Sequence, residues 1–244
     1  MFKVCSINCR GLNSANKRHL VFNDCSKYDV SFLQETYITD IKSDLWKSQW
    51  QGDFFFSKGT NHSNGLITLI KNGSRFQNPY AFYSSERTLV LAGTIGDDLY
   101  FFVNVYGPII GSEKEKFINK LFYILSLFNS DNIIVAGDFN LVINNSLDII
   151  SGVPHNRQHV QLFNNFINSS SLVDTWRLLH EDRKEFTWSR PRPFTARRLD
   201  FIFIHESLSS NVTLANINFN AFSHHKTIIC SFKTYIPKGC HIGR

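Results

Sequence analysis

Two polar side chains follow a short apolar run in the middle of the chain, in the segment NIIVAGDFN from Asn132 to Asn140. The uninterrupted apolar residues before Gly137 are typical of a strand buried on both faces. Asp138 and Asn140 follow at a spacing of two, so both side chains would point the same way from an extended backbone. A carboxylate and an amide delivered together can hold a water molecule or a metal-bound phosphate. An ordinary turn is the alternative, because Gly, Asp and Asn are common turn residues.

Other apolar runs in the chain also end in polar side chains. Phe2–Asn8 is a predicted strand, and the apolar run from Val30 to Leu33 is followed by Gln34 and Glu35. Side chains of these types bind hard cations, orient water or contact phosphate. If the strand ends meet, they predict one site for a metal ion and a phosphate. The complete set, in chain order, is Asn8, Glu35, Tyr106, Asp138, Asn140, Asp200 and His225.

The first half of the chain predicts a layered α/β architecture. A helix capped by Asn13 or Ser14, and running to about Lys27, separates the first two strands, as in one half of a layered α/β unit. From Asp53 to Tyr106 the pattern changes to successive strands with short turns, as in an antiparallel meander. The apolar runs of this meander are Phe54–Phe56, Leu66–Ile70, Leu89–Ile95 and Leu99–Val105.

The second half predicts helices packed on a sheet, followed by two strands. Apolar residues at helical spacing mark the helices. Asp200 lies in the middle of one predicted strand, where an unpaired carboxylate would be costly. The predicted helices are Glu113–Phe128, Asn156–Ser169 and a short piece over Leu172–Leu179, and the predicted strands are Arg198–Ile204 and Thr227–Phe232.

Composition indicates one domain in a reducing compartment. The chain has 244 residues, of which 43% are hydrophobic and 23 are Phe, so it can bury one large core. The five Cys residues are odd in number and lack a metal-ligand spacing, which favours free thiols. No apolar run is long enough to span a membrane, and the N-terminus lacks a signal-peptide hydrophobic region. We expect a soluble monomer that is nuclear or cytoplasmic rather than secreted.

The charge distribution favours a polyanionic partner. The net charge is +6, and one polar segment mixes basic residues with Trp188 and Phe194. Basic groups contact phosphate while aromatic rings stack or wedge against bases. The segment therefore predicts a loop that faces nucleic acid, and a solvated loop is the alternative. Its basic residues are Arg183, Lys184, Arg190, Arg192, Arg197 and Arg198.

Seven short motifs follow one another across nearly the whole chain: SINCRGLN, FLQET, NVYGP, VAGDFN, FTWSR, RRLDFIF and SHHKTII. In this order they resemble the endonuclease/exonuclease/phosphatase superfamily, whose members include DNase I and the apurinic/apyrimidinic endonucleases. The chain is most similar to the endonuclease domain of non-LTR (LINE-type) retrotransposons. The resemblance implies a four-layered α/β sandwich, with two mixed, mostly antiparallel sheets packed face to face and flanked by helices.

The resemblance also implies roles for individual residues. Glu35 would be the principal Mg²⁺ ligand, assisted by Asn8, and Mn²⁺ could substitute. Asp138 would activate the attacking water. The remaining roles would fall to Asn140 and Tyr106 at the phosphate, Asp200 as a supporting carboxylate, His225 as a donor to a phosphoryl oxygen, and Thr187, Arg190, Arg192, Arg197, Arg198 and Ser223 as contacts to double-stranded DNA.

One position departs from the family pattern. The last motif has Asp before its His in the family, whereas this sequence has Ser223, His224 and His225. A carboxylate at that position would orient His225 and favour its protonated form, and a second imidazole cannot supply negative charge. We therefore predict that the catalytic contribution of residue 224 is lost and activity is strongly impaired. The opposite hypothesis is that Asp200 or another acid substitutes.

Three functions fit these observations. The first is an endonuclease that nicks DNA and leaves a 3′-hydroxyl for reverse transcription, followed in the full polypeptide by a reverse transcriptase. The second is a phosphatase or deadenylase, although residues expected for lipid-headgroup or poly(A) recognition are not evident. The third is a DNA-binding domain that has lost turnover. We expect one domain over residues 1–236 and a polar tail over 237–244.

Overall fold

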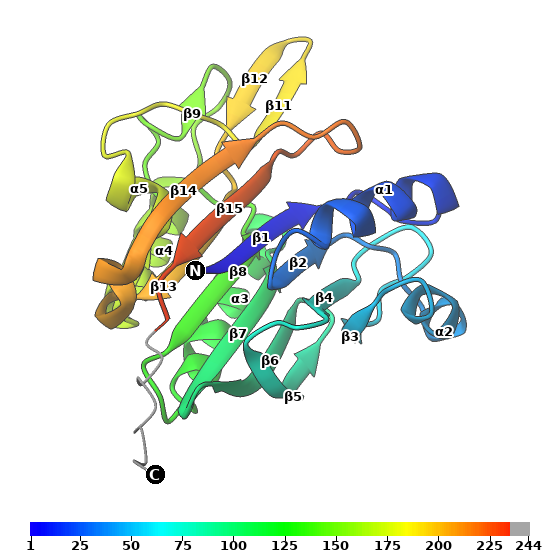
Figure 1. Ribbon diagram of the computed structural model, residues 1–244. Coiled ribbons are helices and arrows are strands. Elements are labelled where there is room, and N and C mark those ends of the chain that lie inside the picture. The colour runs from blue at the N-terminus through cyan, green and yellow to red at the C-terminus, as the bar shows by residue number, and fades with distance from the viewer. Residues whose placement is uncertain (235–244) are drawn as a thin grey trace.

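Two six-stranded sheets pack face to face in the computed structural model, which describes residues 1–234 (Figure 1). The predicted domain boundary at residue 236 and the predicted tail lie outside the described residues. The first sheet has the order β14 (Val212–Asn218), β15 (Thr227–Phe232), β1 (Phe2–Asn8), β2 (Val30–Gln34), β4 (Leu66–Lys71), β3 (Gly52–Ser57). The second has the order β10 (Leu172–Asp174), β13 (Asp200–His205), β8 (Ile133–Asp138), β7 (Asp98–Tyr106), β6 (Thr88–Ile95), β5 (Phe76–Ser85).

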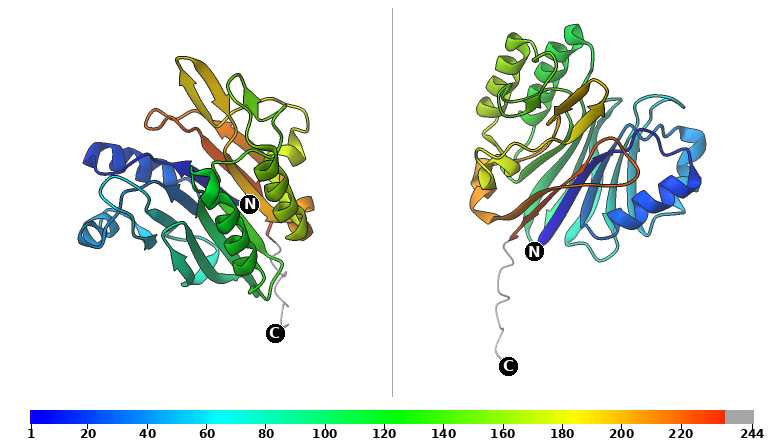
Figure 2. Two further views of the ribbon diagram at one scale, coloured as in Figure 1. Left: turned by 180° about the vertical axis from the view of Figure 1, so that it is seen from behind. Right: turned by 90° about the horizontal axis from the view of Figure 1, so that it is seen from above.

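Helices cover the outer faces of both sheets, so the predicted four-layered α/β sandwich is confirmed (Figure 2). On the first sheet lie α1 (Ala15–Cys25) and α2 (Asp40–Lys47), and on the second lie α3 (Gly111–Leu125) and α4 (Arg157–Ser169). Ser14 caps α1 by accepting a hydrogen bond from the backbone N–H of Lys17, as its sequence position predicts. A short helix, α5 (Thr175–Leu179), follows β10 directly.

Phenylalanine side chains dominate the core between the sheets. Phe102 of the second sheet contacts the ring of Phe2, at a centroid distance of 5.8 Å, and the ring of Phe76, at 4.6 Å. All six residues of β8 are buried, as the uninterrupted apolar run predicts. This packing fixes the two sheets against each other, and with them the side chains at their shared edge.

Strand pairing brings the strand ends that carry the candidate site residues to the same end of the sandwich. β1 pairs with β2 in parallel, and β7 pairs with β8 in parallel, so each pair ends on the same side. β13 runs antiparallel to β8, with Asp200 opposite Asp138. The first residue of β13 therefore meets the last residue of β8.

Several predicted elements differ from the observed ones. The region from Asp53 to Tyr106 is not one meander, because β3 and β4 belong to the first sheet, whereas β5, β6 and β7 belong to the second. Asp200 begins β13 rather than lying in its middle. The piece over Leu172–Leu179 is a strand followed by a helix. The sequence patterns did not predict α2, β5 or β14. These three elements are largely exposed, so their hydrophobic periodicity is weak.

The predicted basic loop is mostly a β-hairpin. β11 (Trp188–Pro191) pairs with β12 (Phe194–Arg197), and β9 (Ile149–Ile150) completes a small third sheet. This sheet stands beyond the end of the sandwich (Figure 1). Among the described residues, no helix has the length and apolar character needed to cross a bilayer.

Candidate active site

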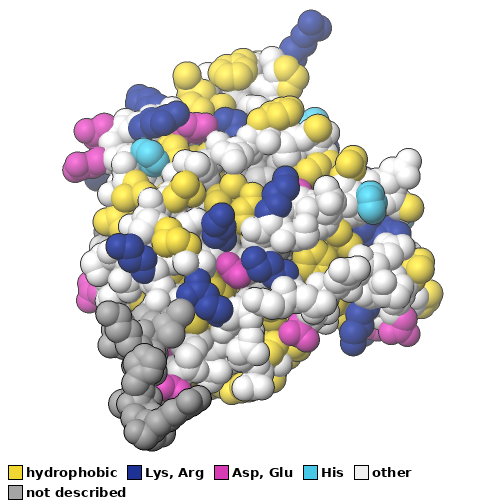
Figure 3. Space-filling model, viewed as in Figure 1, with side chains coloured by type: hydrophobic (Ala, Val, Ile, Leu, Met, Phe, Trp, Pro, Cys, Tyr) yellow, Lys and Arg dark blue, Asp and Glu magenta, His cyan; other side chains and the backbone are white. Residues whose placement is uncertain are grey.

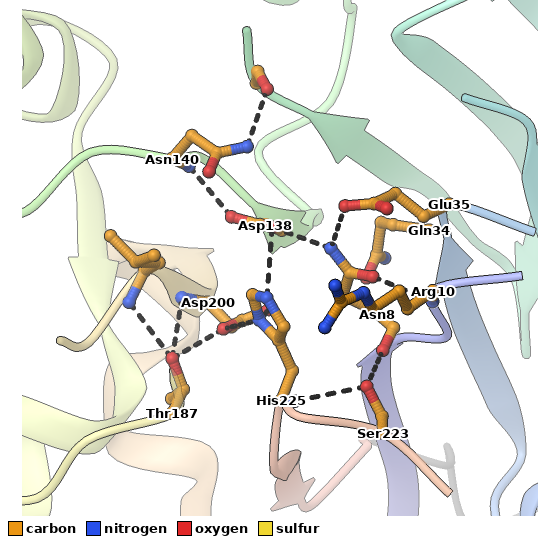
Figure 4. Close-up of polar contacts among 12 residues, drawn as sticks. Asn8, Arg10, Gln34, Glu35, Asp138, Asn140, Thr187, Asp200, Ser223 and His225 are labelled. Carbon is orange, nitrogen blue, oxygen red and sulfur yellow. Dashed lines mark hydrogen bonds and ion pairs between the residues drawn. The ribbon is translucent and has the colours of Figure 1, made fainter. Parts of the chain in front are cut away.

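A cleft of about 660 Å³ lies at the edge where the strand ends meet (Figure 4). Residues from both sheets and from the hairpin line it. They include Asn8, Arg10, Glu35, Tyr37, Tyr106, Ile109, Asp138, Asn140, Trp188, Arg190, Arg197, His224 and His225. Six of the seven strand-end residues singled out in the sequence line this one cleft, and Asp200 lies directly behind His225.

His225 is held by Asp200, which lies on the other sheet. The Nδ1 atom of His225 lies 2.8 Å from Oδ2 and 3.1 Å from Oδ1 of Asp200. Thr187 donates its hydroxyl hydrogen to Asp200 Oδ2 at 2.5 Å, and its oxygen accepts hydrogen bonds from the backbone N–H groups of Leu199 and Asp200. A carboxylate with these partners fixes the imidazole ring. Asp200 therefore supplies the negative charge that the family pattern places at residue 224.

The charges around His225 and Asp138 shift their pKa values toward neutral or alkaline pH. Burial lowers the pKa of His225, but the charge and hydrogen bond of Asp200, with smaller effects of Asp138 and Glu35, raise it to about 9. Burial, followed by repulsion from Asp200, raises the pKa of Asp138 to about 7, against the opposing effects of His225 and Asn8. The Nε2 atom of His225 lies 3.9 Å from Asp138 Oδ2.

Asn8 joins two carboxylates at the end of β1. Its Nδ2 atom lies 2.8 Å from Glu35 Oε1 and 2.8 Å from Asp138 Oδ2. Glu35 has a left-handed backbone, with φ 47°, and is only half-buried. Oxygen atoms from two sheets are therefore held close to one nitrogen atom (Figure 4), and the second oxygen of Glu35, Oε2, lies 3.4 Å from the hydroxyl of Tyr37.

Asn140 reaches the site by a turn and not by strand alternation. Its φ is 50°, so the extended geometry expected from the sequence stops at Asp138. Its backbone N–H donates to Asp138 Oδ1 at 2.9 Å, and its side-chain Nδ2 donates to the carbonyl oxygen of Gly107 at 2.9 Å. Lys114 of α3, which is buried, donates to the carbonyl oxygen of Asn140. Three hydrogen bonds thus fix this residue.

Tyr106 ends β7 beside Glu35 and Asp138. Burial, followed by the charges of these two residues, raises the pKa of its phenol, which therefore stays protonated and can donate a hydrogen bond. The guanidinium of Arg87 lies over its ring, 5.6 Å from the centroid.

The structure contradicts two of the predicted DNA contacts. The side chain of Arg198 is 1% exposed and makes ion pairs with Asp148 at 2.8 Å and Asp174 at 2.5 Å. Thr187 is fully buried beneath Asp200. Both side chains are engaged inside the fold, Arg198 by Asp148 and Asp174 and Thr187 by Asp200, so neither is available to contact DNA. Composition alone could not distinguish the buried Arg198 from the exposed Arg190 and Arg192 of the same segment.

The other predicted DNA-contacting residues differ in their freedom. Arg190 and Arg192 are exposed on the hairpin, and Arg190 and the half-buried Arg197 line the cleft. Ser223 has its hydroxyl engaged within the protein, where it donates to the carbonyl oxygen of Asn8 at 2.6 Å and accepts from the N–H of His225 at 3.1 Å. It therefore anchors the His225 loop. His224 is exposed in the cleft wall.

Sequence reasoning missed three residues of the site. Lys114 supports Asn140 from α3, Arg87 covers Tyr106 from the β5–β6 turn, and Arg10 lines the cleft next to Asn8. The position of Arg10 could have indicated a site residue, because it lies two residues after Asn8, a predicted strand-end ligand. Lys114 and Arg87 carried none, since each approaches the site only through tertiary packing.

Comparison with known families agrees with this geometry. Residues 5–230 match the Endonuclease/Exonuclease/phosphatase family. The chain belongs to this family. A transposon protein, the transposon TX1 uncharacterized 149 kDa protein of Xenopus laevis, is 32% identical over 223 residues, which are 88% of this chain and 17% of that protein. The chain therefore spans less than a fifth of the length of this relative.

Solved structures share the fold of this endonuclease/exonuclease/phosphatase family member. An AP endonuclease from Archaeoglobus fulgidus has a TM-score of 0.78 at 17% identity, covering 96% of this chain and 100% of that one. The AP endonuclease LMAP from Leishmania major has a TM-score of 0.79 at 17% identity, covering 96% and 88%. The endonuclease domain of TRAS1, a telomere-specific non-LTR retrotransposon, has a TM-score of 0.71 at 14% identity, covering 96% and 99%. The resemblance inferred from the sequence motifs is confirmed.

Enzymes of this family generally depend on a divalent metal ion, and the cleft offers suitable ligands. Asp138, Asp200 and His225 can each place an atom within 4.8 Å of the others. However, His225 and Asp200 already bond to each other, and Thr187 occupies Asp200 further. Glu35 and Asp138 also accept hydrogen bonds, but these come from uncharged groups such as the amide of Asn8, and both carboxylates line the cleft. Carboxylate and amide oxygens suit a hard cation such as Mg²⁺, so this side of the cleft fits the metal better.

Proposed function

We propose that this domain is a metal-dependent endonuclease that nicks double-stranded DNA and leaves a 3′-hydroxyl group, which primes reverse transcription by a retrotransposon. One observation carries the proposal. Glu35, Asp138 and His225 lie far apart in the sequence, yet they meet in one cleft with a hydrogen-bonded carboxylate behind the histidine. Such a constellation provides a base, an acid and a cation site for phosphodiester hydrolysis.

Asp138 is the residue that orients and deprotonates the attacking water. It is buried at the end of β8, and its pKa of about 7 matches the range in which a general base is most effective. Its Oδ1 atom accepts the N–H of Asn140, which leaves Oδ2, near Asn8, facing the cleft. Asn140 fixes the carboxylate against rotation, so the water approaches the phosphorus from one direction.

His225 donates a hydrogen bond to a phosphoryl oxygen as negative charge develops there. Its raised pKa, about 9, keeps the imidazole protonated at neutral pH. Nδ1 is occupied by Asp200, and Nε2 therefore carries the proton that faces the cleft. Tyr106, whose phenol is neutral, provides a second donor in the same cleft. Fixed donors of this kind stabilise the transition state more than the ground state.

A divalent metal ion, held by Glu35 with Asn8 and Asp138, would supply positive charge at the phosphoryl oxygens when bound. Glu35 is half-buried and lines the cleft, and its two oxygen atoms accept from Asn8 at 2.8 Å and from the hydroxyl of Tyr37 at 3.4 Å. The oxygen ligands favour Mg²⁺, and Mn²⁺ accepts the same ligand types.

The exposed arginines of the β11–β12 hairpin form the surface proposed to contact DNA. Arg190 and Arg192 are exposed, at the cleft and at the hairpin end, whereas Arg197 lines the cleft but is half-buried and held by Val153 and His155. On the face shown in Figure 3, hydrophobic side chains gather at the top, where the hairpin lies, and a basic side chain projects from its end. Basic groups beside apolar ones suit a nucleic-acid groove.

Substitution of the family Asp by His224 need not impair this chain. The expected impairment assumed that residue 224 orients His225, whereas Asp200 accepts that hydrogen bond here. His224 is exposed and lies at the cleft wall. We therefore favour the hypothesis that Asp200 provides the carboxylate and that the domain turns over.

Relaxation of supercoiled plasmid in the presence of Mg²⁺ tests the proposal. The wild-type protein should convert supercoiled plasmid to open circles, and EDTA should stop the reaction. Glu35→Gln and His225→Ala should each lose most of the activity, while His205→Ala, which removes a half-buried His at the end of β13 and outside the cleft, should retain it. A DNA polymerase should extend the nick directly. Wild-type protein that leaves the plasmid supercoiled, or that instead hydrolyses soluble phosphate monoesters, would refute the proposal.

A further inference from the structure

Arg10 lies in a fixed turn immediately after β1. Its φ is 48°, a left-handed conformation that non-glycine residues adopt uncommonly. The backbone N–H of Arg10 donates to Asn8 Oδ1 at 3.0 Å, and the N–H of Gly11 donates to the carbonyl oxygen of Glu35 at 2.6 Å. Lys17 adds hydrogen bonds to the carbonyl oxygens of Cys9, at 2.6 Å, and Arg10, at 3.3 Å. The turn is therefore tied to the residues that hold the carboxylates.

The side chain of Arg10 points into the site. Figure 4 shows its guanidinium extending toward the space beside Asn8 and His225, and Arg10 lines the cleft. In the close-up, hydrogen bonds and ion pairs reach neighbouring side chains, but none reaches this guanidinium. Arg10 is thus an exposed cation directed at a pocket whose own acidic groups are bound to Asn8, Asn140, Thr187 and His225.

Other arginines near the site are used differently. Arg198 is enclosed between Asp148 and Asp174, and Arg197 donates to the carbonyl oxygen of Val153 at 2.8 Å and contacts His155 at 3.1 Å. These contacts hold the hairpin in place. Arg10 differs because its backbone is fixed, whereas its guanidinium, with five N–H donors, makes no hydrogen bond or ion pair within residues 1–234. A guanidinium with free donors matches two oxygen atoms of a phosphate in a planar fork.

We propose that Arg10 binds the non-bridging oxygens of the scissile DNA phosphate and is a further substrate-contacting residue of the cleft. The inference rests on the proposed nuclease function and deepens it. The phosphate would lie between Arg10 and His225, with Asp138 behind it. The guanidinium supplies permanent positive charge on the side of the phosphate near Asn8, independent of pH.

Binding of DNA in the absence of metal tests the role of Arg10 separately from turnover. A fluorescein-labelled duplex is titrated in EDTA with wild-type protein, Arg10→Gly, Arg10→Lys and the control Lys27→Gln. Glycine keeps the left-handed turn while removing the cation, so loss of binding cannot be ascribed to the backbone. Lys27 precedes β2 at the opposite edge of the sheet and makes only an exposed pair with Asp24.

Arg10→Gly should weaken binding about tenfold or more, the size of a lost charge-assisted hydrogen bond. It should also lower the slope of log affinity against log salt by roughly one phosphate contact. Arg10→Lys should fall between Arg10→Gly and the wild type, because the charge remains without the planar fork. Lys27→Gln should bind as the wild type does.

A neutral methylphosphonate placed at the mapped nick position identifies the phosphate. It should weaken binding by the wild type, but it should add little to the defect of Arg10→Gly. Independent losses, or normal binding by Arg10→Gly, would overturn the assignment. So would tighter Mg²⁺ binding by Arg10→Gly with unchanged DNA binding, since Arg10 would then act on the carboxylates. A wild type that binds duplex without nicking contradicts the proposed nuclease function alone, and the unmodified duplex still decides whether Arg10 contacts DNA.

Discussion

At the cleft, a single carboxylate organises three neighbours. Asp200 accepts from Thr187 and contacts the Nδ1 atom of His225, and its backbone lies opposite Asp138. The meeting of the strand-end polar residues in one cleft could be predicted, because polar residues at the ends of apolar strands are unusual in number here. Which acid holds His225 could not be decided from the sequence, since the Asp200–His225 contact joins two sheets. The family pattern places a carboxylate at residue 224 and leaves Asp200 as the alternative, and in the structure Asp200 contacts the imidazole.

The pH dependence of stability should reveal this pair. The pKa of His225 is about 9 in the folded protein against an ordinary value of 6.5. The pair therefore stabilises the fold fully below about pH 6.5, and this contribution is lost as the pH rises through 9. Asp200→Asn should thus reduce the free energy of unfolding most at acidic to neutral pH and least above pH 9. Urea unfolding across pH, with an NMR titration of His225, measures both quantities. An unchanged His225 pKa in Asp200→Asn would contradict the pairing.

The buried Lys114 ammonium is expected to lower the stability of the fold at neutral pH while it supports nicking activity through Asn140. Burial, opposed by the charge of Asp138, lowers its pKa to about 8 from 10.5. Below pH 8 the buried ammonium therefore costs stability, and the free energy of unfolding should rise between pH 8 and 10.5. Lys114→Met should abolish this rise and reduce nicking about tenfold, because the carbonyl oxygen of Asn140 loses its donor. Urea unfolding and plasmid assays measure the two effects; nicking at the wild-type rate would show that Asn140 does not need Lys114.

Among the elements, the parallel pairs β1–β2 and β7–β8 do most to assemble the site, because they place successive strand ends on one edge. Helices with an N-cap and an apolar face, such as α1 and α4, could be predicted within a few residues. Short or exposed strands such as β5 and β14 could not, because their burial patterns lack clear alternation. The division of the middle strands between two sheets also depends on long-range pairing that local patterns do not encode.

Gly137 lies where β8 packs closely against β7. Its φ is 151°, and a Cβ atom there would lie 2.0 Å from the carbonyl oxygen of Val105. Gly137→Ala should therefore destabilise the fold by about 2–4 kcal/mol and displace Asp138. Gly73→Ala is a matched control, because Gly73 also has positive φ, 74°, but nothing within 4 Å, so it should cost only about 1 kcal/mol. Urea unfolding of both variants gives the comparison, and equal losses would rule out the close contact.

At the scale of the whole molecule, the candidate active site depends on the fixed position of the two sheets relative to each other. Asn8, Glu35 and His225 come from the first sheet, whereas Tyr106, Asp138 and Asp200 come from the second. The aromatic core between them, centred on Phe102, holds the two halves in place. Composition predicted a single large core, and the motif order predicted the sandwich. The contact between His225 and Asp200 joins side chains from the two sheets at the candidate site.

Nicking rates of Asp200→Asn and His224→Asp, measured side by side with the wild type on supercoiled plasmid in Mg²⁺, test the central claim most directly. If Asp200 orients His225 across the two sheets, Asp200→Asn should lose at least about a hundredfold in rate, by analogy with removal of the carboxylate behind a catalytic histidine. His224→Asp should stay within a few-fold of the wild type. A large gain in rate in His224→Asp, together with near-normal nicking by Asp200→Asn, would contradict the account.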